Sequence, residues 1–207
     1  MDAQASRSRS KSVSHTVGAL VASLASVSAA SASVASVHVI APAPGFQQTQ
    51  AFAVSPDGEV AAGDSFGVGG VGFTFSPATG RSDVQRWEYS GVVGIAADAR
   101  TLALNTWSIE DGGRAVRWNG DDAVQVFAAP AGFAETHAAA ISRDGNVIVG
   151  AASSRSGWGT TWQAFRWAAD GVNVQAETIG PAGSRARAVS ADGRVVVGDS
   201  DQGAWLW

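Results

Sequence analysis

Short apolar runs alternate with turn residues along positions 37 to 207, and the pattern returns four times. Each run is four residues long, is rich in apolar residues and follows a turn that contains aspartate. The runs are Val60 to Gly63, Thr101 to Leu104, Val147 to Gly150 and Val195 to Gly198. Continuous apolar runs of this length are typical of strands that are covered on both faces.

An aromatic strand is predicted after each apolar run, beyond a variable polar loop. These strands are Gly72 to Phe75, Ala115 to Trp118, Ala164 to Trp167 and Ala204 to Trp207. A further strand is predicted in three units, at Val84 to Tyr89, Ala123 to Phe127 and Val172 to Ile179. Four strands in about 45 residues is the pattern of one blade of a β-propeller.

The turn before each apolar run has nearly the same sequence in every unit. Its four copies are Ala53 to Gly58, Gly94 to Ala99, Ala140 to Gly145 and Ala188 to Gly193, and their aspartates lie 41, 46 and 48 residues apart. Pro56 favours a type I turn, which leaves Gly58 in the left-handed conformation while the Ser55 hydroxyl caps the turn. The second copy has Ala96 and Ala99 in place of the serine and the glycine. We therefore predict a structural role for these aspartates.

One ungapped match within the chain defines the repeating unit. Val37 to Gly58 aligns with Val124 to Gly145, and eleven of 22 positions are identical. The match makes Val37 to Ile40 equivalent to a fourth strand. We predict an all-β fold, a β-propeller of about four four-stranded blades, in which this N-terminal strand completes the last blade and closes the ring. A fragment of a larger propeller is the alternative.

Residues 1–35 have a different composition from the repeat domain at 36–207. Arg7, Arg9 and Lys11 precede the apolar stretch Val17 to Val27, and small residues follow. This is the pattern of a secretory signal peptide, and a disordered Ala/Ser-rich leader is the alternative. We expect cleavage between about Ala29 and Val37 and a secreted, cell-surface or periplasmic protein. No later stretch is apolar and long enough to predict an integral membrane protein.

The charge and composition of the repeat domain exclude several classes of partner and chemistry. Without the leader the chain keeps eleven arginines and 17 acidic residues, a formal charge of −6, and it has no lysine. An acidic surface without a basic cluster argues against nucleic acid as a partner. The chain has no cysteine, which excludes disulfides and thiolate metal ligands.

Candidate catalytic groups are few, and we predict no enzyme, cofactor or metal site. The internal match places glutamine opposite both His38 and His137, as expected of solvated strand positions. Acidic residues cluster at Glu110 and Asp111, at Asp121 and Asp122, and around Ser200 as Asp199 and Asp201. Two carboxylates on different blades could act as a glycosidase pair, so a polysaccharide hydrolase stays open as an alternative.

Tryptophan supplies the only candidate ligand contacts. Four tryptophans belong to the aromatic strands and are expected to pack between blades. Trp107, Trp158 and Trp162 fall in the variable loops instead. Tryptophans exposed in loops can stack on sugar rings or form contacts at the centre of a protein interface.

Taken together, the turn, the Val-Val-Val-Gly strand and the Ala-Phe-x-Trp strand resemble the HAF repeat of exported bacterial "extracellular repeat" proteins. The resemblance covers residues 37 to 207 and is strongest at Ala140 to Gly150 and Ala188 to Gly198. It implies a β-propeller type of fold and no particular activity. Ser55 to Gly58 is also similar to the WD40-like repeat of TolB-type periplasmic propellers, although only this copy of the turn contains proline.

These observations predict an exported, non-enzymatic repeat protein, monomeric, that presents loops to a protein or a glycan. The alternatives are the polysaccharide hydrolase and a TolB-like periplasmic interaction module.

Overall fold

The computed structural model describes residues 36–67, 69–84, 89–108, 110, 112–120, 124–156, 159–170 and 173–207. The predicted leader at 1–35 and Trp158 lie outside these residues. Residues 38–207 form one compact unit, which is the part of the chain described below. All regular secondary structure in the described residues is β, so the predicted all-β class is confirmed.

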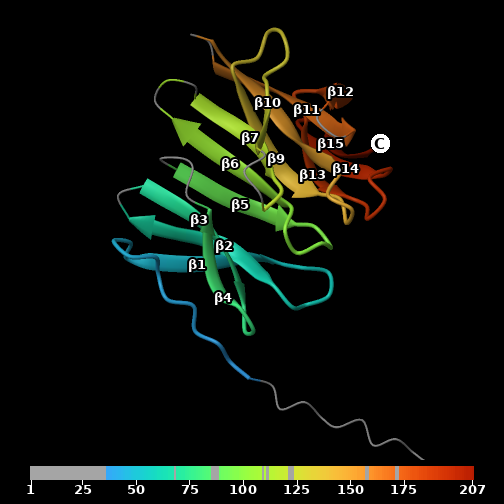
Figure 1. Ribbon diagram of the computed structural model, residues 1–207. Coiled ribbons are helices and arrows are strands. Elements are labelled where there is room, and N and C mark those ends of the chain that lie inside the picture. Colours follow the sequence, from blue (N-terminus) through green and yellow to red (C-terminus); the bar gives the residue numbers. More distant parts are fainter. Residues whose placement is uncertain are drawn as a thin grey trace, which may run out of the picture. The chain divides into compact units, whose positions relative to one another are not determined.

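The strands form four antiparallel sheets that follow one another in chain order (Figure 1). Within each sheet, strands that are neighbours in sequence are neighbours in space, and the last sheet has three strands where the others have four. The first sheet contains β1 (Gln48–Val54), β2 (Ala61–Gly67), β3 (Gly69–Ser76) and β4 (Gly80–Val84). The second contains β5 (Tyr89–Ile95), β6 (Leu102–Ser108), β7 (Gly112–Trp118) and β8 (Val124–Phe127). The third contains β9 (Glu135–Ile141), β10 (Val147–Ser156), β11 (Gly159–Asp170) and β12 (Asn173–Ala182), and the last contains β13 (Arg185–Val189), β14 (Val196–Ser200) and β15 (Gly203–Leu206).

The predicted apolar and aromatic strands are the second and third strands of each sheet, and one predicted fourth strand is wrong. In the first sheet this strand is Gly80–Val84, whereas Tyr89 already begins β5. The chain reverses earlier than we predicted because Gly80 adopts a φ of +76° and pairs directly with Ser76 across a short turn. The Ser76 and Thr79 hydroxyls, 2.8 Å apart, hold that turn.

The aspartate turns connect the first and second strands, and they have the predicted geometry. Gly58 has a φ of +80°, and its N–H donates to the Ser55 carbonyl over 2.8 Å. The Ser55 hydroxyl accepts from Val60 N–H at 2.9 Å and donates to Asp57. That serine hydroxyl, together with the Glu59 N–H, holds the pKa of Asp57 below its ordinary value. The aspartate therefore serves the turn, as predicted.

The second turn keeps the same backbone with different side chains. Ala99 takes the left-handed conformation at a φ of +55°. Asp98 accepts from the Thr101 N–H at 2.8 Å and from the Thr101 hydroxyl at 2.6 Å. Thr101 thus replaces the missing serine from the other side of the turn.

Each sheet has a back face turned toward the next sheet and a front face turned toward the preceding one. In the second sheet, Leu102 and Leu104 pack with residues of the first sheet, whereas Ala103 packs with residues of the third. All three are fully buried, so this strand is covered on both faces as predicted. Between the second and third sheets, Phe127 stacks on Trp167 with ring centroids 5.4 Å apart, which confirms the predicted packing role of that tryptophan.

A buried hydroxyl in the first strand of two sheets, and directly before the first strand of a third, accepts a hydrogen bond from the sheet before it. Ser90 accepts from Gly72 N–H at 2.7 Å, Thr136 from Ala115 N–H at 2.9 Å and Ser184 from Ala164 N–H at 3.3 Å. The three hydroxyl residues stand eight positions before their turn aspartates. The same bond therefore recurs at all three contacts between successive sheets.

A second bond between sheets starts seven positions after the turn aspartate. Asp64 accepts from the Val92 N–H with both carboxylate oxygens, at 2.9 and 3.1 Å. Asn105 accepts from the Ala138 N–H at 2.6 Å and also donates to the Ala138 carbonyl at 3.0 Å. Both amides lie at a β-bulge in the first strand of the following sheet.

The predicted closing strand at Val37 to Ile40 is not present. Residues 36–43 have no regular secondary structure, and the His38 ring lies 6.2 Å from that of Phe75 in β3. Arg81 of β4 donates to the Ala41 carbonyl at 2.8 Å. This segment therefore lies against the first sheet and does not pair with the last, and no closed ring is formed by the described strands.

Replacing Thr136 with alanine tests the hydroxyl bond between sheets. The change leaves the Ala115 N–H and the Phe127 carbonyl without the partner that they share in a fully buried position. We expect the free energy of unfolding in urea to fall by about 1–3 kcal/mol. Thr136→Ser keeps the hydroxyl and is the matched control. Equal losses in the two variants would contradict the role of the bond.

Replacing Asp64 with asparagine tests the second bond through its pH dependence. Burial raises the pKa of Asp64 to about 7, although the Val92 N–H favours the ionised form. In the unfolded chain the group titrates near its ordinary pKa of about 3.9. The folded state therefore holds the proton more tightly, and the stability that this contributes is complete below about pH 4 and lost as the pH rises to about 7.

Asparagine does not titrate, and at this position it can make both bonds that Asn105 makes. We expect Asp64→Asn to unfold at a higher urea concentration than the wild type at pH 8, with a gain of about 1–3 kcal/mol that shrinks toward pH 4. A difference between the two proteins that does not vary with pH would show that the Asp64 carboxyl does not titrate as described.

Candidate functional site

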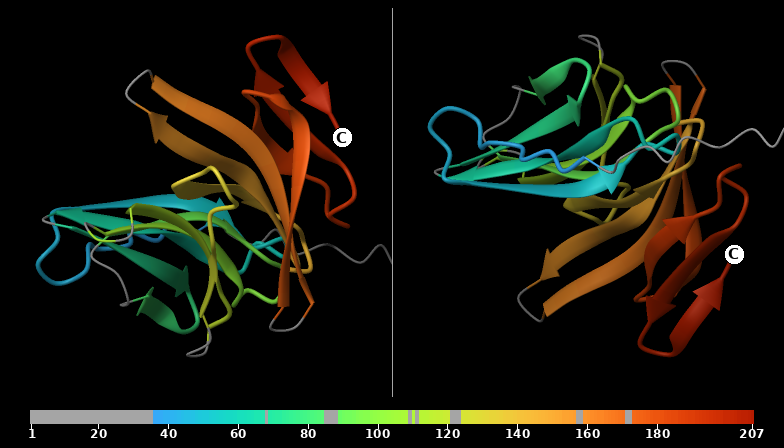
Figure 2. Two further views of the ribbon diagram at one scale, coloured as in Figure 1. Left: turned by 90° about the horizontal axis from the view of Figure 1, so that it is seen from above. Right: turned by 90° about the horizontal axis from the view of Figure 1, so that it is seen from below.

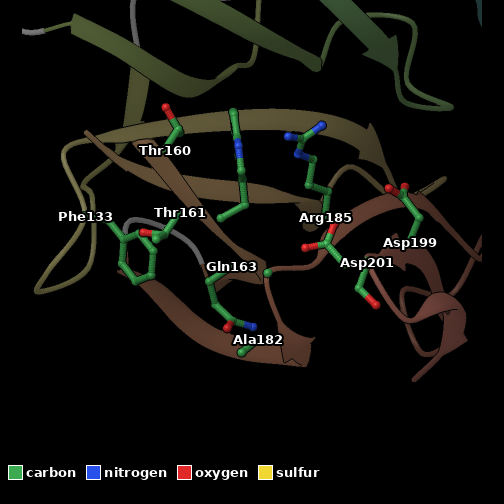
Figure 3. Close-up of a pocket in the computed structure, with 11 residues that line it drawn as sticks. Phe133, Thr160, Thr161, Gln163, Ala182, Arg185, Asp199 and Asp201 are labelled. Atoms are coloured by element: carbon green, nitrogen blue, oxygen red, sulfur yellow. The ribbon is translucent and has the colours of Figure 1, made fainter. Parts of the chain in front are cut away.

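A cavity opens between the third and last sheets. It has a volume of about 610 Å³ and is lined by aromatic, hydroxyl, amide and charged side chains. In Figure 3, Phe133, Thr160 and Thr161 lie on one side, and Arg185, Asp199 and Asp201 lie on the other. The lining residues are Phe133, Thr160, Thr161, Trp162, Gln163, Ala182, Gly183, Arg185, Asp199, Ser200 and Asp201.

Trp162 is held at the junction of the two sheets by charged and aromatic neighbours. The Arg185 guanidinium lies over its indole, 4.1 Å from the ring centroid. The His137 ring packs against the same side chain at 5.2 Å with a tilt of 49°. A cation over an indole is attracted by the ring's electron density. The indole is therefore fixed in orientation, and Arg185 covers one of its faces.

The wall formed by β11 and β12 is fixed by hydrogen bonds to the backbone. The Gln163 amide donates to the Ile179 carbonyl at 2.9 Å, at the point where the pairing of β11 with β12 shifts register. Gly183 N–H donates to the Trp162 carbonyl at 3.0 Å, and Gly183 has a φ of +75°, a conformation that glycine adopts without strain. These bonds carry the chain from the third sheet into the last one along the edge of the cavity.

The acidic wall comes from β14 and the turn that follows it. Asp199 accepts hydrogen bonds from the Arg187 guanidinium, one of them at 3.2 Å from Nη2. These bonds hold the pKa of Asp199 below its ordinary value. A carboxylate held in its ionised form accepts hydrogen bonds but is a poor proton donor. The wall therefore offers acceptors for hydroxyl or amide groups.

The structure places the three predicted contact tryptophans differently. Trp107 and Trp162 lie in strands β6 and β11, so their predicted placement in loops is wrong. Trp162 lines the cavity. Trp107 lies in the second sheet, is 45% exposed and packs edge-on against Tyr89 at 5.9 Å, away from the cavity lining. Trp158 lies outside the described residues. Only one of the three is thus found at this site.

Sequence reasoning missed most of the cavity wall. Asp199 and Asp201 were recognisable as an acidic cluster, but nothing in their spacing indicated that they would face a tryptophan of the preceding unit. Arg185 gave no signal, since it is an isolated arginine at the start of a strand. Of the other acidic clusters, Asp111, Asp121 and Asp122 lie outside the described residues.

Two further features of the described residues bear on chemistry. No group of three or more His, Cys, Asp and Glu side chains comes together there in a way that could hold a metal ion. The same part of the chain contains no helix long and apolar enough to cross a membrane.

The sequence matches no family model, and it matches no curated protein. Among solved structures, the chain is similar to TolB from Acinetobacter baumannii, with a TM-score of 0.49 and 14% sequence identity. The similarity covers 70% of this chain and 36% of the TolB chain, so the chain spans about a third of that protein.

Proposed function

We propose that this chain is an exported, non-enzymatic binding protein built from propeller-type blades, and that it binds a neutral glycan in the cavity between its third and last sheets. The observation that carries the proposal is the chemistry of the cavity wall. Hydroxyl, amide, carboxylate and guanidinium groups surround an aromatic residue in one hollow of about 610 Å³. Sugars present hydroxyl groups around a ring that has an apolar C–H face, and such a wall offers partners to both parts.

The charges of the wall favour a neutral ligand over an acidic one. Two carboxylates, Asp199 and Asp201, face the cavity, and Asp199 already forms an ion pair with Arg187. Arg185 is engaged with the Trp162 ring. An anionic sugar would bring a third negative group beside the two carboxylates, and Arg185 is the one cation among the lining residues, so the charge of the lining stays negative.

The hydrolase alternative is less well supported at this site. A glycosidase needs one carboxyl group that keeps its proton to donate to the leaving group. Asp199 has its pKa lowered by Arg187, in the opposite direction to that requirement. The TolB-like interaction module, the HAF-type repeat and export through the leader at 1–35 stay predictions from the sequence.

The proposal is tested by titrating the full-length chain with a panel of neutral oligosaccharides, with tryptophan fluorescence and calorimetry as readouts. We expect at least one to bind, and Trp162→Ala and Asp201→Ala each to weaken it about tenfold or more. Trp107→Ala removes an exposed tryptophan from another sheet and is the matched control, expected to leave binding within about twofold. Absence of binding across the panel, or an equal loss in Trp107→Ala, would overturn the proposal.

A further inference from the structure

The back face of the last sheet is built like the faces that pack between sheets, but it is uncovered. Val197 stands five positions after its turn aspartate and is 41% exposed, whereas its three counterparts are fully buried. Those counterparts are Ala62, Ala103 and Val149. Leu206, which pairs with Val197 across the sheet, is 74% exposed. The face is apolar where a following sheet would cover it.

The front face of the first sheet is also exposed, and it is the kind of face that packs on a back face elsewhere in the chain. Val54 stands three positions before its turn aspartate and is 61% exposed. Its counterpart in the second sheet, Ile95, is 6% exposed, and those in the third and last sheets, Ile141 and Val189, pack against clusters that join successive sheets. The first sheet therefore presents the other half of the same contact.

The two end faces also carry the two halves of both hydrogen bonds that join successive sheets. Asp199 stands at the same position of its sheet as Asp64 and Asn105. Those two side chains bind the Val92 and Ala138 amides, and Ala51 stands at the position of these amides in the first sheet. Asp199 instead forms an ion pair with Arg187 of its own sheet.

Thr49 supplies the hydroxyl of the other bond, at the position of Ser90, Thr136 and Ser184. The amides that donate to those hydroxyls belong to third-strand residues, and Ala204 is their equivalent in the last sheet. It pairs with Asp199 as Gly72 pairs with Asp64 and Ala115 with Asn105. In the structure the Thr49 hydroxyl lies 2.9 Å from that of Ser65 within its own sheet.

The segment before the first sheet lies where the fourth strand of a preceding sheet would lie. By the internal match, His38 to Ile40 corresponds to Gln125 to Phe127 of β8. His38 contacts Phe75 of the aromatic strand. The fourth strand β8 also contacts the aromatic strand of the following sheet, through Phe127 and Trp167, although the internal match places Ile40 and not His38 opposite Phe127. The last sheet has no fourth strand beyond β15 among the described residues. The last sheet thus has an open edge, and a segment that the internal match aligns with a fourth strand, but that forms no strand itself, precedes the first sheet.

We propose that these two ends meet between copies of the chain: the back face of the last sheet of one copy receives the front face of the first sheet of a second copy, head to tail. A second copy is the occupant we infer because the third sheet separates the first and last sheets of one chain in both views of Figure 2. This replaces the monomer expected from the sequence, since that expectation relied on a closing strand from the same chain. Head-to-tail contacts use two different surfaces, so two copies with opposite defects complement each other.

The test uses the full-length chain and two variants that each place a charge on one end. Val197→Asp disables the back face of the last sheet, and Val54→Asp disables the front face of the first. By light scattering, the wild type is expected to associate as its concentration rises, and each variant alone to associate about tenfold more weakly or not at all. An equimolar mixture of the two variants is expected to form dimers, because each supplies the surface that the other lacks.

Val126→Asp is the matched control, since Val126 is 52% exposed on β8 and belongs to neither end face. It is expected to associate like the wild type. A wild type that stays monomeric, variants that associate as strongly as the wild type, or a mixture that stays monomeric would each overturn the proposal. A monomeric wild type would point to closure within one chain or to coverage by another segment.

Discussion

The structure depends on one recurring requirement: a backbone N–H in the third strand of a sheet finds its acceptor in the next sheet. Ser90, Thr136 and Ser184 meet that requirement at the three contacts between sheets, in positions that are almost completely buried. A buried amide without an acceptor costs more than the net gain of an ordinary hydrogen bond. Successive sheets are therefore held in one relative position, and the apolar clusters between them are shaped around this fixed point. The cavity beside Trp162 also depends on it, because Ser184 joins the third and last sheets next to the cavity wall.

The same requirement explains why the two ends of the series differ from its middle. In the middle, each sheet completes the hydrogen bonds and covers the apolar residues of the one before it. At the ends the equivalent groups bind within their own sheet, Asp199 to Arg187 and Thr49 to Ser65. Val54 and Val197 are more exposed there than the residues at the same positions of the other sheets. A repeated contact that is made inside the chain and left unmade at its two ends favours head-to-tail association of identical chains. Glycan binding and assembly use different residues, apart from Asp199, which borders both the cavity and the end face.

The sequence was most informative where chemistry is local. The aspartate turns, the apolar strands and the aromatic strands follow from two or three neighbouring residues, and their places in the chain were predicted correctly. The apolar run of the last sheet is the exception to the predicted burial, because Val195 and Val197 are exposed. The boundary of β4 was missed because the turn at Gly80 carried no repeat signal. The hydroxyls between sheets were missed because serine and threonine alternate there, and an isolated hydroxyl in a strand has no distinctive pattern. The cavity wall depends on which residues of two units face each other, and that follows from the relative position of the sheets, which no spacing in the chain encodes.

Each sheet is fixed by hydrogen bonds that it makes with its neighbour. Amide hydrogen exchange measured by NMR tests this residue by residue, because protection reports which N–H groups are bonded in the folded state. The account predicts that the Ala115 and Ala164 amides, which donate across sheets, exchange as slowly as the core of their own strands, and that the Ala204 amide exchanges much faster in the monomer. Rapid exchange at Ala115 and Ala164, at rates typical of loops, would contradict it.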